Sequence, residues 1–305
     1  MDRHQVATTG PLPAMIPRRR FRVTRAPLAP GEPPRRGRGI YLLPNAFTTA
    51  SLFCGFYAIV QAMNARFDYA AVATFVAMLL DSLDGRVARL TNTQSAFGEQ
   101  YDSLSDMVSF GAAPALIMYE WTLRGLGKWG WLAAFVYCAG AALRLARFNA
   151  NIGVVDRRYF QGLPSPAAAA LVMGLIWIVT DLRETRWITA SPADLAWVAW
   201  VFTVYAGLTM VSNAPFYSFK DINLRRSVPF IVVLGVVLLF VLVSSDPPVV
   251  LFSLFVLYGL SGWAVWLWRL KSGRAAPWRE SAGGSAQPPA ASAPPPPPTV
   301  APPRE

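Results

Sequence analysis

Long apolar stretches separated by short polar breaks occupy most of this 305-residue chain, and they limit its fold more than any other feature. Each stretch is close to the ~20 residues that an α-helix needs to cross a bilayer. Charged residues make up only 15% of the chain, whereas an average soluble protein has roughly 25%. The sequence therefore predicts an all-α integral membrane protein with about eight transmembrane helices. The expected spans are residues 45–63, 69–90, 97–123, 129–148, 164–182, 195–211, 228–244 and 249–270.

The two ends of the chain differ from this apolar middle. Residues 1–38 are polar and rich in Pro and Arg, and no apolar core with a small-residue cleavage site follows Met1, as a signal peptide would require. Residues 273–305 are rich in Pro and Ala. Because neither composition can build a packed core, both tails are expected to be disordered.

The distribution of charge predicts how the chain lies in the membrane. The net charge is +11, with the excess Arg and Lys in the tails and loops. Basic segments beside apolar spans favour an anionic lipid surface over nucleic acid. The bias of Arg and Lys between alternate loops predicts that both termini face the cytoplasm of a bacterial-type inner membrane. Cys54 and Cys138 lie in apolar runs and offer no disulfide framework, and the single histidine, His4, excludes most His-dependent chemistry.

Four aspartates stand between the second and third apolar stretches. Asp81 and Asp84 are three residues apart, and Asp102 and Asp106 are four apart. On a helix either spacing places both side chains on one face. The stretch between them, residues 90–97, is polar and suits a turn. Two antiparallel helices would then bring both pairs of carboxylates to one point, at the cytoplasmic end of their spans.

A divalent cation explains why a membrane protein would keep such acids. A carboxylate within a membrane helix costs roughly 2.5–3.5 kcal/mol on insertion scales, and neighbouring carboxylates also repel one another. Carboxylate oxygens are hard ligands that select Mg²⁺, Mn²⁺ or Ca²⁺ over zinc. A structural charge network or a proton relay is the alternative for these residues.

The aspartates belong to a longer pattern, D-x-x-D-G-x-x-A-R followed after about eight residues by G-x-x-x-D-x-x-x-D. Its fixed positions are Asp81, Asp84, Gly85, Ala88, Arg89, Gly98, Asp102 and Asp106. This pattern resembles that of the CDP-alcohol phosphatidyltransferase family. The resemblance implies two bound divalent ions, Mg²⁺ or Mn²⁺, held by the aspartates. It also implies that Asp106 is the catalytic base as well as a metal contact.

The same resemblance implies a site for the nucleotide of a CDP-linked lipid. The residues concerned are Asn45, Thr48, Gly85, Ala88, Arg89 and Gly98. The two glycines would let the nucleotide and backbone approach closely, and Arg89 suits phosphate oxygens. Two alternatives remain open, because Asn45 can serve only as a helix N-cap and Arg89 can be an interfacial arginine that reaches toward water.

Three flanking stretches, residues 105–114, 144–149 and 159–166, look like those of the membrane-integral bacterial phosphatidylserine synthases within this family. The resemblance implies CDP-diacylglycerol and L-serine as substrates and residues 39–212 as the catalytic helices. The two uncharged apolar runs within residues 213–272 predict two further transmembrane helices. Arg144 and Arg147 would share a helix face where they could hold a carboxylate, and Ser105 is a further acceptor-binding candidate.

Other functions remain open on the sequence. Glycerol 3-phosphate, an inositol species or choline could be the acceptor, since arginines would attract the phosphorylated alcohols as well. An ion or proton transporter would also place acids in membrane helices, but it predicts inverted repeats, which the sequence does not show. Membrane lipids are the expected surroundings, nucleic acid is not an expected partner, and a homodimer is implied only by the resemblance.

Overall fold

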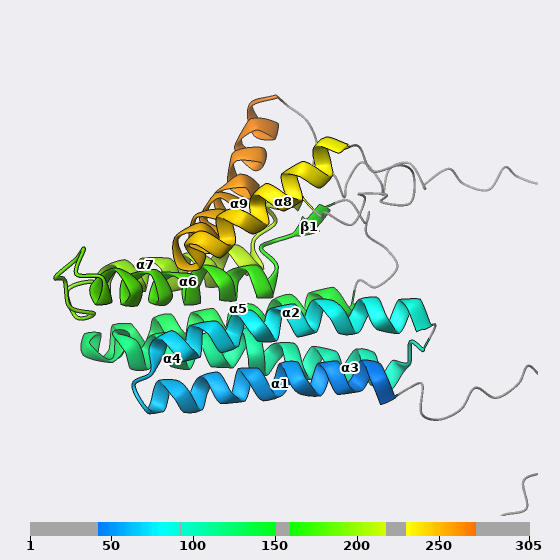
Figure 1. Ribbon diagram of the computed structural model, residues 1–305, viewed down its shortest axis with the longest axis horizontal. Coiled ribbons are helices and arrows are strands. Elements are labelled where there is room, and N and C mark those ends of the chain that lie inside the picture. The colour runs from blue at the N-terminus through cyan, green and yellow to red at the C-terminus, as the bar shows by residue number, and fades with distance from the viewer. Residues whose placement is uncertain (1–41, 92, 151–158, 218–229, 273–305) are drawn as a thin grey trace, which may run out of the picture. The chain divides into compact units, whose positions relative to one another are not determined.

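The computed structural model describes residues 42–91, 93–150, 159–217 and 230–272, most of which are helical (Figure 1). The tails predicted to be disordered lie outside these residues. The helices are α1 (Leu42–Met63), α2 (Phe67–Thr91), α3 (Ala96–Asp106), the π-helix η1 (Met107–Ala112), α4 (Ala113–Trp121), the 3₁₀-helix η2 (Leu123–Leu126), α5 (Lys128–Ala150), α6 (Ser165–Glu184), α7 (Ala196–Val211), α8 (Phe230–Ser245) and α9 (Pro247–Lys271). Two short strands are β1 (Tyr159–Gln161) and β2 (Pro215–Tyr217).

Wherever the structure describes them, the apolar stretches predicted from the sequence are helical, which confirms the all-α membrane fold. Of the helices in the described ranges, α1, α5, α6 and α9 are long and apolar enough to cross a bilayer. The helices α7 and α8 are apolar but shorter. The helices α2 and α3 carry the four aspartates, which makes them more polar than their neighbours.

The third predicted span, residues 97–123, is not one regular helix. It consists of α3, the π-helix η1 and α4 in direct succession, and it ends at Trp121. Pro114 accounts for the change, because proline has no N–H to donate and its ring clashes with the carbonyl four residues earlier, that of Phe110. The helix widens to the π form over the residues just before this proline.

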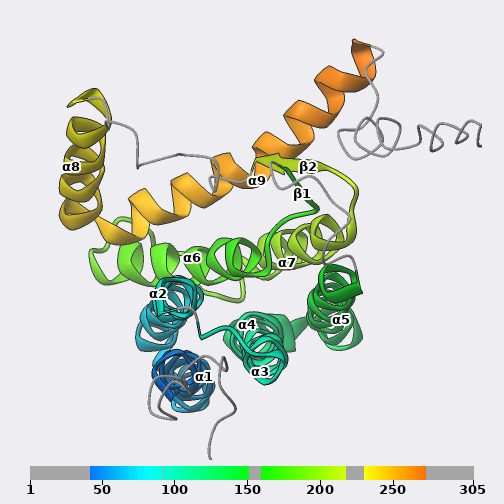
Figure 2. The same cartoon turned by 90° about the vertical axis from the view of Figure 1, so that its right-hand side faces the viewer.

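The helices around the aspartates pack closely through small residues. Figure 2 shows α1, α2, α5 and the α3–α4 segment nearly end-on, with α6 beside α2. A Cβ added at Gly55 of α1 would lie 2.5 Å from the Ser109 hydroxyl oxygen of η1. The hydroxyls of Ser105 and Ser109 donate to the carbonyls of Thr48 and Ser51 in α1, at 3.2 and 3.3 Å. The segment that carries Asp102 and Asp106 is therefore held firmly against α1.

The strands, which were not predicted, link the C-terminal helices to the rest. Strand β1 pairs antiparallel with β2, with Gln161 opposite Pro215. The buried Phe216 of β2 lies against α9, where its ring fills the space that a Cβ at Gly262 would need. Helix α9 also packs along α6, which is the most buried long helix of the described residues.

Candidate active site

A short connection between α2 and α3 returns the chain toward the aspartates of α2. The Thr93 N–H donates to the Ala88 carbonyl at 3.0 Å just beyond the end of α2. Ser95 caps α3, since its hydroxyl oxygen accepts a hydrogen bond from the Gly98 N–H at 3.0 Å. Side-chain capping of this kind satisfies a donor that the first turn of a helix leaves free. The predicted turn is therefore present, with α2 and α3 running on either side of it.

Acids from both helices meet, as the sequence predicted. One carboxylate oxygen from each of Asp81, Asp102 and Asp106 lies within 4.8 Å of the other two. The carboxyl of Asp84 comes close to that of Asp102, so the fourth acid adjoins the other three. We call these four residues the acidic cluster.

Thr48 of α1 holds Asp84 in place. Its hydroxyl donates to Asp84 Oδ2 at 2.8 Å, and the two residues are 4% and 5% exposed. A hydrogen bond to a buried charged acceptor is stronger than one between neutral groups. Thr48 was predicted to contact a nucleotide. Its hydroxyl can donate to Asp84 of the acidic cluster or, at 3.2 Å, to the Pro44 carbonyl, and its contact with a nucleotide stays a prediction.

The unpaired oxygens of the cluster fit a divalent metal. Within the described residues, Asp102 Oδ1 and Asp106 Oδ1 are buried and have no hydrogen-bond partner. No Lys or Arg of the described ranges forms an ion pair with any of the four carboxylates, although Arg144 is near enough to Asp106 to interact electrostatically. Buried carboxylates need a compensating positive charge. Several carboxylate oxygens around one point form a donor set suited to Mg²⁺ or Mn²⁺.

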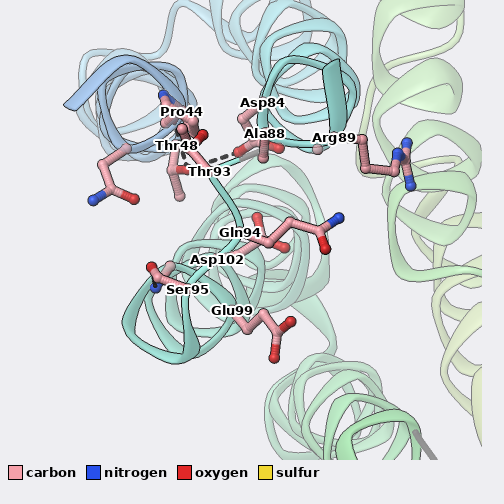
Figure 3. Close-up of a pocket in the computed structure, with 13 residues that line it drawn as sticks. Pro44, Thr48, Asp84, Ala88, Arg89, Thr93, Gln94, Ser95, Glu99 and Asp102 are labelled. Atoms are coloured by element: carbon pink, nitrogen blue, oxygen red, sulfur yellow. Dashed lines mark hydrogen bonds between the residues drawn. The ribbon is translucent and has the colours of Figure 1, made fainter. Parts of the chain in front are cut away.

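An open cavity lies beside the acidic cluster, between α1, α2 and α3 (Figure 3). It is lined by Pro44, Asn45, Thr48, Asp84, Gly85, Ala88, Arg89, Thr93, Gln94, Ser95, Gly98, Glu99 and Asp102. All six residues predicted to bind a nucleotide are among them, so the structure brings them together, and their contacts with a nucleotide stay predictions. The turn residues that also line the cavity, Thr93, Gln94 and Ser95, were not among those predicted from the sequence. Their position between the two halves of the motif was the available signal.

The two motif glycines and Arg89 differ in their surroundings. A Cβ on Gly85 would meet only the Arg89 guanidinium, at 4.0 Å, so the space in front of Gly85 is open to a ligand. A Cβ on Gly98 would lie 3.2 Å from the Ser95 hydroxyl oxygen, so Gly98 allows the helix cap to close. Arg89 is exposed, and in Figure 3 its side chain extends from α2 away from α1.

The residues predicted to bind the acceptor have unequal environments. Arg144 donates from Nη1 to the Ser165 hydroxyl oxygen at 2.9 Å, and its buried Nε has no partner among the described residues. Arg147 donates to the Val211 carbonyl at 2.8 Å and to Asn213 Oδ1 at 3.3 Å, and so caps the end of α7.

Ser105, the third acceptor candidate, is only 1% exposed, and its hydroxyl donates to α1. The geometry favours Arg144 over Arg147 and Ser105 for a contact with an acceptor. All three assignments stay predictions.

The fold and the site together define a class of protein: an integral membrane protein of apolar helices built around a carboxylate cluster suited to divalent metal. The chain belongs to the CDP-alcohol phosphatidyltransferase family, whose family model matches residues 41–208. This range includes α1 to α6 and nearly all of α7, and with them the whole acidic cluster and the cavity. Members of the family are phosphotransferases, and the family generally uses divalent metals.

Relatives named CDP-diacylglycerol–serine O-phosphatidyltransferase come from distant organisms. The relative from Helicobacter pylori is 35% identical over 224 residues, which are 73% of this chain and 92% of the relative. The one from Mycobacterium tuberculosis is 34% identical over 188 residues, covering 59% of this chain and 63% of the relative. The one from Saccharomyces cerevisiae is 40% identical over 141 residues, covering 42% of this chain and 50% of the relative.

Proposed function

We propose that this protein transfers the phosphatidyl group of CDP-diacylglycerol to the hydroxyl of L-serine, which gives phosphatidylserine and CMP. The observation that carries the proposal is the meeting of Asp81, Asp102 and Asp106 beside an open cavity lined by the family motif. The names of the relatives support serine as the acceptor. Family membership favours phosphoryl transfer over the ion-transport alternative.

The acidic cluster would hold two divalent ions, Mg²⁺ or Mn²⁺. When bound, they neutralise negative charge on the phosphoryl oxygens and on the departing CMP. Thr48 keeps the Asp84 carboxylate turned toward this position through its 2.8 Å hydrogen bond. The open space at Gly85 admits the nucleotide close to the backbone of α2.

Asp106 acts as the general base for the acceptor. It accepts the proton of the serine hydroxyl as that oxygen forms a bond with the phosphorus that carries diacylglycerol. The bond from this phosphorus to the oxygen of CMP breaks, and CMP leaves. A carboxylate is the suitable base, because the motif contains aspartates and no histidine. Burial of Asp106 Oδ1 without a partner leaves an acceptor site open for this proton.

Arg144 binds the carboxylate of serine. Its guanidinium lies near Asp106, so a carboxylate held there would bring the serine hydroxyl toward the base. An arginine can hold a carboxylate through two parallel hydrogen bonds. Choline has no anionic group for Arg144, whereas glycerol 3-phosphate and an inositol phosphate do. Those two acceptors are therefore the alternatives that require a direct test.

The orientation in the membrane follows from the Arg and Lys bias. The acidic cluster lies at the cytoplasmic ends of α2 and α3 in a bacterial-type inner membrane, with both termini in the cytoplasm. CDP-diacylglycerol would then enter the cavity from the inner leaflet, and serine from the cytoplasm.

Release of CMP by purified protein tests the proposal. CDP-diacylglycerol is supplied with L-serine, sn-glycerol 3-phosphate, an inositol phosphate or choline, each with Mg²⁺, with Mn²⁺ or with EDTA. We expect release with serine and divalent metal only. Asp106→Asn should lower turnover by about 10²–10⁴-fold, the usual contribution of a general base, whereas the control Glu99→Gln alters an exposed acid of the same cavity and should retain most activity. Release driven by another acceptor would remove the serine assignment, and full activity in EDTA would remove the metal.

A further inference from the structure

The segment that carries the proposed base is held by α5 on both sides of Asp106. Three residues before it, the Ser103 hydroxyl oxygen accepts a hydrogen bond from the Asn149 side-chain amide at 3.1 Å. Four residues after it, the Phe110 carbonyl accepts one from the Tyr137 hydroxyl at 2.9 Å. The second contact falls inside the π-helix η1, which begins at the residue following Asp106.

The Phe110 carbonyl has a particular need for this donor. In a regular α-helix it would accept from the N–H four residues later, but that residue is Pro114, which has none. Tyr137 is fully buried, so its hydroxyl has no access to water and needs a protein partner. The hydroxyl thus compensates for the missing amide and stabilises the widened turn.

The position of Asp106 is tied to this turn, because η1 continues α3 directly after it. The carboxyl of Asp106 meets that of Asp81, but its Oδ1 has no hydrogen-bond partner among the described residues. Its direction toward Asp81 and Asp102 depends on the backbone of α3 and of the turn that follows. π-helical turns are rare and occur frequently at functional sites.

We propose that Tyr137 is a positioning residue for the acidic cluster: through the Phe110 carbonyl it maintains the π-helical turn that directs Asp106 toward Asp81 and Asp102. This inference rests on the metal-binding role given to the cluster in the proposed function. It assigns the role to a hydroxyl that lies outside the motif and outside the cavity lining.

Direct binding of Mn²⁺ tests the inference without substrate. The purified full-length protein is titrated with Mn²⁺ and followed by electron paramagnetic resonance, and thermal unfolding is measured in parallel in EDTA. Tyr137→Phe keeps the ring and removes only the hydroxyl. We expect its affinity for Mn²⁺ to fall by about 2- to 10-fold, as for the loss of one neutral hydrogen bond.

The chain offers a matched control. The Tyr205 hydroxyl also donates to a backbone carbonyl at 2.9 Å, that of Gly259, but it joins α7 to α9 and neither residue lines the cavity. Tyr205→Phe should lower the unfolding temperature to a similar extent and leave Mn²⁺ affinity unchanged. An equal loss of affinity in both variants would mean that Tyr137 only stabilises the fold, which would overturn the inference.

Pro114→Ala provides a second test that does not depend on the stability of Tyr137→Phe. Alanine restores an N–H that can satisfy the Phe110 carbonyl and removes the clash that favours the π form. The Pro114→Ala protein should therefore unfold at the same temperature as the unaltered protein or a higher one, yet bind Mn²⁺ more weakly. Wild-type affinity for Mn²⁺ in both Tyr137→Phe and Pro114→Ala would overturn this inference and leave the proposed function standing. Failure of the unaltered protein to bind Mn²⁺ would overturn both.

Discussion

Replacement of Asp102 by Asn separates the stability of the acidic cluster from its function. The substitution keeps the shape of the side chain and removes one negative charge. Oxygens of Asp81, Asp102 and Asp106 lie within 4.8 Å of one another. Two unit charges at 4.8 Å repel by about 3.5 kcal/mol at an effective dielectric constant of 20. The metal-free protein should therefore become more stable when Asp102 is neutral.

The net gain is smaller than this repulsion. Solvent and partial protonation of the carboxyl groups already relieve part of it, so we expect about 1 to 2 kcal/mol. The amide of asparagine can also donate to the neighbouring Asp84 carboxylate, which an ionised Asp102 cannot. For a chain of this size such a gain corresponds to a rise of about 2 to 3 °C in Tm.

Thermal unfolding of detergent-purified protein measures both effects. In EDTA, Asp102→Asn should unfold at a higher temperature than the unaltered protein. With saturating Mn²⁺ the order should reverse, because metal stabilises only a site that can bind it. Glu99→Gln, the control in the same cavity, should change Tm by less than about 1 °C in either condition. A lower Tm for Asp102→Asn in EDTA would refute the reasoning, since it would show that the carboxylate is paired in the metal-free protein.

Three further predictions follow from single contacts. Thr48→Val should raise the metal concentration for half-maximal activity by about 10-fold, because it removes a charge-assisted hydrogen bond to Asp84, whereas Thr48→Ser should retain most of the affinity in the same assay. Arg144→Gln should raise KM for serine in steady-state kinetics with little change for CDP-diacylglycerol, whereas Arg147→Gln, which loses its bonds to the end of α7, should lower Tm instead. Gly55→Ala should lower Tm in thermal unfolding by an amount equivalent to about 1–3 kcal/mol, because the added methyl overlaps the π-helix. Unchanged serine KM in Arg144→Gln, or unchanged Tm in Gly55→Ala, would contradict the respective reasoning.

The sequence alone was enough to predict the membrane helices and the meeting of the acids. Apolar runs of the right length leave few folds other than a helical membrane protein, because the backbone must satisfy its own hydrogen bonds in lipid. Spacings of three and four residues place Asp81 with Asp84 and Asp102 with Asp106 on single helix faces, and a short polar turn returns the chain. These are local rules, so they can be read from the order of residues. The particular motif adds the family, which the comparisons confirm.

Other features depend on contacts between residues distant in the sequence. The π-helix could be suspected from Pro114 but not located, because its stability also depends on Tyr137 of another helix. The unequal surroundings of Arg144 and Arg147 were not predictable either, since the two lie three residues apart on the same helix and differ only in what α6 and α7 present to them. The strands β1 and β2 pair across more than 50 residues of chain. Periodicity along the chain therefore determined which residues share a face, whereas the packing of helices against one another decided which atoms on that face were left unpaired and open to a ligand.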